Sequence, residues 1–222
     1  MPCSDGVFSI DWSRYRLVDL SYTVTPPGTH ERPFLTERGL LADDSFMHHV
    51  RTHTHVGTHV EAPAHFFQGG RTVVDFPLEN FLGRAVLLSV PVAVDHIPVT
   101  AADCERLLGD LMQPGDIVLC RNADGPSRTG PQVGWPALAA ESAQWLADRQ
   151  ARLVGFDNYF RLGRDIPEVR RVHDILLSRD ICLVEFLDNL DALTQPVFIF
   201  MCLPFKAAAD SAWGRAVAIE QR

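Results

Sequence analysis

Residues 53–66 read HTHVGTHVEAPAHF, within a cluster that places six of the nine histidines in eighteen residues. Gly57 and Pro63 both disfavour a helix at this point. In an extended chain, alternate side chains point to the same face, so residues 53–61 would present His, His, Gly, His and Glu on one side. A glycine in the middle of that face would leave room for an ion or ligand to approach the backbone.

Such a face predicts a metal site. Buried imidazoles and a carboxylate are costly without partners. A divalent metal removes this cost, because neutral imidazoles and carboxylates are its natural nitrogen and oxygen ligands. The alternative is a surface strand with solvated histidines, but their alignment with Glu61 on one face favours the metal.

Residues 55–66 resemble the H-x-G-T-H-x-D-x-P-x-H-F signature of the metal-dependent cyclase superfamily, which includes bacterial kynurenine formamidases and isatin hydrolases. Further similar stretches are FPLENFLG (76–83), PGDIVL (114–119), AESAQWLA (140–147) and LVEFL (183–187), so the resemblance spans roughly residues 17–220. It implies an α/β fold of the swivelling β/β/α type, with a mixed sheet or barrel-like core. We expect a single domain over residues 1–222, in which residues 1–15 are an N-terminal extension.

The resemblance also implies site residues and a cofactor. Carried over position by position, the metal ligands are His55, His59, Glu61, His173 and Glu185. They would hold one or two divalent ions, Zn or Mn, and a second ion would be shared through Glu61. His65 would be the catalytic acid/base; it follows Pro63, where the strand alternation breaks. Read without the resemblance, His173 could pack in the core, and Glu185 could be a charge at a strand end.

Three departures from the family pattern predict a different pocket. Glu61 replaces the aspartate ligand, the family's N-terminal aromatic-Pro-Gly-Asp element is replaced by TPPGTHERPFLTERG (25–39), and Asn-Tyr-Phe (158–160) stands where formamidases carry small hydroxyl residues. We therefore expect a substrate other than N-formylkynurenine. The expected pocket residues are His53, Phe66 and Asn158.

Hydrophobic patterning predicts strands interleaved with fewer helices. The expected strands cover 16–23, 46–54, 84–90, 116–121, 152–156, 181–186, 196–202 and 214–220. One helix is expected after a capping box at Thr100 and Asp103 and ends before Pro114; two more cover about 136–149 and 167–177.

Composition limits the other function classes. The 222 residues are 46% hydrophobic, enough for a core without disulfides, and the net charge of −8 disfavours a nucleic-acid partner. No apolar run approaches the ~20 residues of a membrane helix, and the N-terminus lacks a secretory pattern. The five cysteines are scattered, and Cys182 and Cys202 lie in apolar runs typical of buried thiols. We expect a cytoplasmic protein without a membrane partner.

These observations favour an enzyme. The first hypothesis is a metal-dependent hydrolase of an amide, lactam or ester, with a metal-activated water and His65 as acid/base. The second is a metal-dependent cyclase or dehydratase that tailors a natural product. The third is a non-catalytic metal- or ligand-binding module. The expected partners are a small-molecule substrate and further copies of the chain, in a homodimer or homotetramer.

Overall fold

The computed structural model describes residues 10–29, 32–91, 97–124 and 135–222. Its main sheet has eight strands in the order β1-β13-β12-β6-β8-β10-β11-β5, and β5 also pairs with β13. Seven of the strands therefore close into a barrel, with β1 added at the edge of β13. The strands are β1 (Tyr15–Asp19), β2 (Gly28–Thr29), β3 (Arg32–Leu40), β4 (Phe46–Thr52), β5 (His59–Glu61), β6 (Leu82–Val90), β7 (Ile97–Val99), β8 (Ile117–Asn122), β9 (Pro136–Leu138), β10 (Leu153–Asp157), β11 (Cys182–Leu187), β12 (Val197–Pro204) and β13 (Ser211–Gln221).

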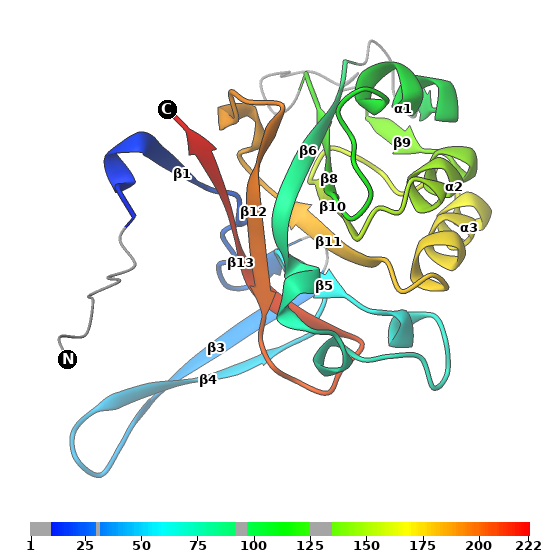
Figure 1. Ribbon diagram of the computed structural model, residues 1–222. Coiled ribbons are helices and arrows are strands. Elements are labelled where there is room, and N and C mark those ends of the chain that lie inside the picture. The colour runs from blue at the N-terminus through cyan, green and yellow to red at the C-terminus, as the bar shows by residue number, and fades with distance from the viewer. Residues whose placement is uncertain (1–9, 30–31, 92–96, 125–134) are drawn as a thin grey trace, which may run out of the picture.

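Three helices cover one side of the barrel (Figure 1). They are α1 (Ala101–Leu108), α2 (Ala140–Asp148) and α3 (Ile166–Leu177). They connect the parallel strands β6, β8, β10 and β11. Alternate residues of these strands belong to two separate apolar clusters: in β8, Ile117 and Leu119 fill the barrel, whereas Val118 and Cys120 pack with the helices. Burial on both faces explains the continuous apolar runs of these strands, and the predicted mixed α/β fold with a barrel-like core is confirmed.

The helix predictions are confirmed at two of three positions. The capping box of Thr100 and Asp103 begins α1, and α3 covers the predicted range. The helix expected from Pro136 is wrong in its first turn, because Pro136–Leu138 forms β9 and α2 begins only at Ala140. The backbone of this segment bonds instead to Arg161, whose N–H donates to Pro136 O and whose carbonyl accepts from Leu138.

A hairpin of β3 and β4 projects from the barrel (Figure 1). The strand at 46–54 was expected, whereas β3 falls partly in the Pro/Gly-rich stretch and was not. The hairpin exposes apolar side chains, among them Leu40, Phe46 and Val50. The expected homo-oligomer stays a prediction.

The cysteines of the described residues are free and buried, as expected for Cys182 and Cys202; Cys3 lies outside the described residues. Burial raises the pKa of the Cys104 and Cys202 thiols to about 12. Within the described part of the chain, no helix is long and apolar enough to cross a membrane.

The Glu220 side chain links β13 to β1 and to the segment before β12. Its side chain is buried on β13 and accepts hydrogen bonds from Arg16 and from the N–H groups of Thr194 and Gln195, both at 2.8 Å. Burial alone would raise the pKa of Glu220, but these bonds and the Arg16 charge outweigh it and hold the pKa below its usual value. The ionised form therefore stabilises the fold above the unfolded pKa of about 4.5, and this contribution is lost as the pH falls.

We expect Glu220→Gln to destabilise the protein by about 2 kcal/mol at pH 7.5. For a chain of this size, that corresponds to a loss of roughly 4–8 °C in Tm. The difference from the wild type should shrink at pH 4, because the Glu220 carboxylate of the unfolded wild-type chain begins to take up a proton below about 4.5. Thermal unfolding of both proteins at the two pH values measures it. An equal difference at both values would show that the charge contributes nothing.

Candidate metal centre

Within residues 53–66, only the three residues 59–61 form a β-strand. β5 covers His59–Glu61, so the predicted extended chain over residues 53–61 is wrong. Gly57 interrupts it with a φ of +64°, and a Cβ there would lie 2.2 Å from Cγ2 of Val24. The glycine therefore serves a left-handed turn against Val24, and not the approach of an ion to the backbone. The turn folds His55 onto His59, so the two histidines meet although they are not on one strand face.

Thr58 joins β5 to β11. Its hydroxyl donates to the carbonyl of Phe186 at 2.6 Å and accepts the Tyr22 N–H at 2.7 Å. Phe186 has a φ of +56°, and the pairing of β11 with β10 shifts register at this point, as in a bulge. Bulges change where a strand directs its side chains. Here the bulge adjoins Glu185, which pairs with His59 across the sheet.

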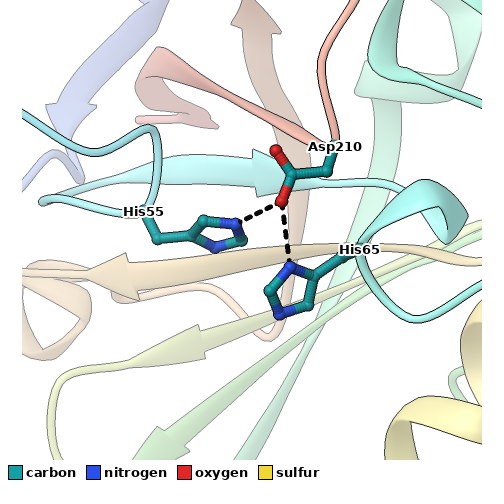
Figure 2. Close-up of side chains that lie close together, drawn as sticks. All are labelled: His55, His65 and Asp210. Carbon is teal, nitrogen blue, oxygen red and sulfur yellow. Dashed lines mark hydrogen bonds and ion pairs between the residues drawn. The ribbon is translucent and has the colours of Figure 1, made fainter.

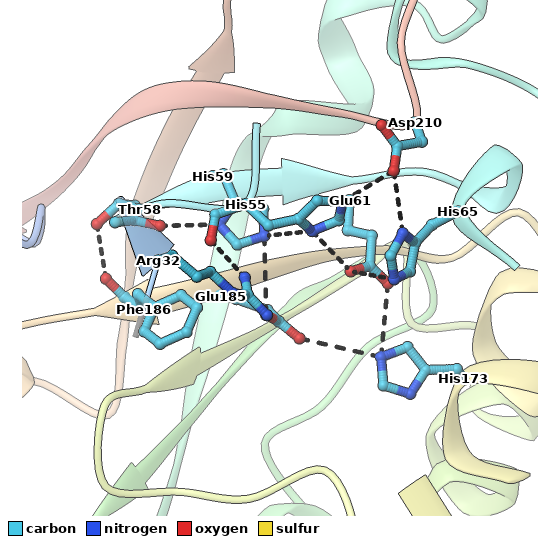
Figure 3. A network of polar contacts seen from close by, with 11 residues as sticks. Arg32, His55, Thr58, His59, Glu61, His65, His173, Glu185, Phe186 and Asp210 are labelled. Carbon is cyan, nitrogen blue, oxygen red and sulfur yellow. Dashed lines mark hydrogen bonds and ion pairs between the residues drawn. The ribbon is translucent and has the colours of Figure 1, made fainter. Parts of the chain in front are cut away.

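Three ligand-type atoms meet at His55, and we call them the first donor set (Figure 3). His55 Nδ1 lies 3.1 Å from His59 Nε2 and 3.4 Å from Glu61 Oε2. A tetrahedral zinc ion with ligands at 2.0–2.1 Å holds them about 3.3 Å apart. The spacing of the first donor set therefore fits one ion.

The second donor set lies on the other side of Glu61 (Figure 3). His173 Nε2, on α3, lies 3.5 Å from Glu61 Oε1 and 3.9 Å from Glu185 Oε1. Glu61 thus directs one carboxylate oxygen toward each set. The arrangement fits the expected alternative in which a second ion is shared through Glu61, and it gathers all five expected ligands in one cluster. Their role as ligands stays a prediction.

Hydrogen bonds assign the ring protons of the three histidines that are expected to be ligands. His59 Nδ1 lies 2.8 Å from Gly57 O, and His173 Nδ1 lies 2.7 Å from Val169 O. A carbonyl only accepts, so both Nδ1 atoms carry the hydrogen and both Nε2 atoms offer a lone pair. His55 Nε2 bonds in the same way to the Asp210 carboxylate at 2.8 Å. In neutral His55, lone pairs of two imidazoles and a carboxylate therefore face one another, an arrangement that a cation stabilises.

The two buried carboxylates give a second test of the fit. Glu61 Oε1 is buried and has no hydrogen-bond partner in the described part of the chain. Burial alone would raise the pKa of Glu61, but the hydrogen bond that His55 donates in its protonated form and the charges of the neighbouring imidazoles outweigh burial and lower the pKa. Burial and the Glu61 charge raise the pKa of Glu185 to about 7. Two such carboxylates side by side need positive charge, which a divalent ion provides.

The histidines differ in how readily they accept a proton. Burial lowers the pKa of His59 to about 4, which keeps its ring neutral and able to bind metal near pH 7. Burial alone would also lower the pKa of His55, but the hydrogen bonds to Glu61 and Asp210 outweigh burial, and the net effect is a raised pKa. A proton on His55 therefore competes with an ion at the first donor set.

His65 and Asp210 form the open rim of the cluster (Figure 2). His65, on the 3₁₀ turn Pro63–His65, lies with Nδ1 3.0 Å from Asp210 Oδ2 and Nε2 3.7 Å from Glu61 Oε2. Asp210 precedes β13 and is about 150 residues from the motif in sequence. Sequence reasoning missed it, because nothing in the surrounding AAADSAWG distinguishes this aspartate from a loop residue.

The expected pocket residues meet different environments. Phe66 stacks on His173, with ring centroids 4.4 Å apart, and makes an edge contact with His65. Asn158 is buried and lines a cavity beside Glu185. His53 is exposed and is not among the residues that gather around Glu61, so the structure does not bring it to the site.

The model of the Cyclase family matches residues 18–160, more than half of the chain. The chain belongs to the Cyclase family. The motif at 55–66 lies inside the matched range, so the resemblance drawn from these residues is confirmed.

Its relatives include named enzymes. Kynurenine formamidase of Erythrobacter litoralis is 27% identical over 214 residues, which cover 92% of this chain and 94% of that protein. Cyclase-like protein 3 of Oryza sativa is 33% identical over 192 residues, which cover 78% and 64%. Isatin hydrolase A from Labrenzia aggregata shares the fold, with a TM-score of 0.77 at 21% identity over 95% of each chain. These likenesses support an enzyme and the predicted fold.

Glu61→Gln tests whether one carboxylate serves both donor sets. We expect binding of Zn²⁺ or Mn²⁺ to weaken at least tenfold at both sets, because an amide offers each ion less negative charge and one nitrogen that cannot ligate. Competition with a chromophoric chelator measures the affinity. Glu61→Asp, which keeps the charge, is the matched control and should retain metal. Unchanged affinity and stoichiometry in the Gln variant would contradict the shared ligand.

Proposed function

We propose that this protein is a metal-dependent hydrolase that cleaves an amide, lactam or ester bond. The observation that carries the proposal is the convergence of unprotonated imidazole nitrogens on the buried Glu61 carboxylate, with His65 beside them. The named relatives support amide hydrolysis. The chain therefore combines a place for a cation with a side chain able to move protons.

The residues that would hold the ions are the two donor sets. When bound, a divalent ion supplies Lewis acidity, which lowers the pKa of a water molecule and polarises a carbonyl group. Zn and Mn both suit a set of imidazoles and carboxylates. The backbone bonds of His59 and His173 hold these rings in place before an ion arrives.

His65 is placed to transfer the proton. Its Nδ1 is engaged by Asp210, so its Nε2 is left for the reacting groups and lies on the Glu61 side. From there His65 would accept a proton from the attacking water and deliver it to the leaving nitrogen or oxygen. Its side chain is 33% exposed, so a substrate can reach it without moving the barrel.

We propose that a flat apolar part of the substrate occupies the cavity beside Glu185. The cavity measures about 120 Å³ and is lined by Trp135, Phe156, Asn158, Phe160, Leu162 and Phe186 besides Asp157 and Glu185. This is close to the size that holds one small ring. Asn158 Oδ1 is buried without a hydrogen-bond partner in the described residues, so a substrate N–H would satisfy it.

His65→Ala tests the proton transfer. We expect kcat to fall by about 10²–10⁴, while metal content stays the same because His65 belongs to neither donor set. Turnover of aryl formamides, lactams and esters, together with metal analysis, measures both. His53→Ala is the matched control, since that histidine is exposed and should change neither quantity. A His65→Ala enzyme as fast as the wild type would refute the assignment.

Oxygen-18 separates hydrolysis from cyclisation. The family name keeps a cyclase or dehydratase as a second candidate. A hydrolase places solvent oxygen in its product, whereas a cyclase or dehydratase consumes no water. If a metal-loaded protein turns over none of the substrate panel, which includes N-formylkynurenine and isatin, the result favours the third hypothesis, a non-catalytic metal- or ligand-binding module.

Asn158→Leu tests the cavity. A net hydrogen bond of about 0.5–1.5 kcal/mol corresponds to a two- to twelvefold loss of kcat/KM. We expect this loss for an amide substrate but not for the ester of the same shape, which has no N–H to donate. Steady-state kinetics on the matched pair measures the difference. Equal losses for both substrates would show that Asn158 acts only through packing.

A further inference from the structure

One carboxylate oxygen bonds two histidines of the site. Asp210 Oδ2 lies 2.8 Å from His55 Nε2 and 3.0 Å from His65 Nδ1 (Figure 2). An aspartate carboxylate is ordinarily ionised near neutral pH and can then only accept hydrogen bonds. At these two distances, both ring nitrogens therefore carry hydrogen.

The backbone holds Asp210 in this position. The N–H of Ala62, directly after β5, donates to the carbonyl of Asp210 at 2.8 Å. Val73 N–H donates in the same way to Ala209 O at 3.0 Å. The loop before β13 is thus bonded to the segment that carries Glu61 and His65, and the carboxylate stays beside both histidines.

We propose that Asp210 is a positioning residue that sets the ring tautomers of His55 and His65 together. For His55 it leaves Nδ1 as the lone pair that faces His59 and Glu61. For His65 it leaves Nε2 as the lone pair available for proton transfer. The second consequence rests on the proposed hydrolase activity; the tautomers themselves do not.

The comparison with the other histidines supports this role. His59 and His173 bond their second nitrogen to backbone carbonyls, so the fold itself determines their tautomers. His55 bonds instead to a side chain, and so does His65. Carboxylates bonded to ligand histidines typically strengthen metal binding by orienting the ring. A carboxylate bonded to a catalytic imidazole holds it in the reactive tautomer in the same way.

Asp210, His55 and His65 also lie close enough to form a metal site of their own. An ion at that site would need the lone pair on His55 Nε2. The hydrogen of neutral His55 would then lie on Nδ1, the atom that faces His59 and Glu61, and His55 could not contribute to the first donor set. The 2.8 and 3.0 Å separations are ordinary hydrogen bonds. We therefore assign Asp210 as the orienting acceptor.

The direct test is the tautomeric state in solution. Long-range ¹H–¹⁵N spectra of the metal-free protein with ¹⁵N-labelled histidine, at pH 8.5, distinguish hydrogen on Nδ1 from hydrogen on Nε2. We expect Nε2–H for His55 and Nδ1–H for His65 in the wild type. In Asp210→Ala the His65 signal should change toward Nε2–H, while His59 and His173 keep theirs. Unchanged His65 and His55 signals would overturn the proposal.

Metal binding and kinetics test the two consequences separately. We expect Asp210→Ala to bind metal about 10–100-fold more weakly in chelator competition. With metal saturating, kcat should fall at least tenfold while KM changes little. In a His65→Ala background, removal of Asp210 should lower kcat no further; an equal further fall would show a general structural role and overturn the assignment.

Two further variants control for folding. Asp210→Asn retains an accepting oxygen without charge, so we expect smaller losses than in Asp210→Ala; losses equal to those of Ala would contradict orientation by the oxygen. Asp19→Ala removes a partly exposed aspartate that bonds Arg215 away from the donor sets, and it should change neither metal affinity nor kcat. If the wild type binds metal but hydrolyses nothing, the proposed function fails, while the tautomers still decide the role of Asp210.

Discussion

The pairing of β5 with two neighbours is the constraint on which the rest of the structure depends. The strand has only three residues, yet it bonds β11 on one edge and β13 on the other and so closes the barrel. The same pairings place His59 opposite Glu185, and Glu61 opposite Ser211, the residue after Asp210. Barrel closure and assembly of the site are therefore one event, and a change in β5 should affect stability and metal binding together.

This placement has an electrostatic cost. A barrel interior favours apolar side chains, and Val60 occupies it from the centre of β5, but its neighbours are a buried imidazole and a buried carboxylate. Burial of a carboxylate without compensation destabilises a fold. Burial and the Glu61 charge raise the pKa of Glu185 to about 7, whereas the imidazoles around Glu61 lower the pKa of that carboxylate, so the two carboxylates do not ionise equally readily. A divalent ion at either donor set would offset this cost, so ligand binding is coupled to folding.

Residue types and short-range patterns were sufficient to predict much of this arrangement. The buried parallel strands were predictable because their apolar runs are continuous, and α3 because apolar residues recur at helical spacing after Pro167. The turn at Gly57 was not, because the requirement comes from Val24, which is distant in sequence. A tertiary backbone bond to Arg161 likewise overrides the helix signal at Pro136. The five expected ligands lie close together although the predicted strand is wrong, because the family motif identified them by residue type and not by strand alternation; their role as ligands stays a prediction.

Asp210 shows why sequence reasoning stopped short of the complete site. A cluster of histidines can be recognised in a sequence as a potential metal site, because several histidines close together are rare. A residue that orients a ligand is an ordinary aspartate in a loop, and only the fold shows what it contacts. His59 and His173 need no such partner, because local backbone carbonyls two and four residues away already accept their protons. His55 and His65 lie where the chain turns, and in the described part of the chain neither ring bonds a backbone carbonyl. The acceptor for both rings is instead the side chain of Asp210, which is distant in sequence. The ring orientations at the open rim therefore depend on a long-range contact, whereas the orientations of the buried His59 and His173 rings depend on local ones.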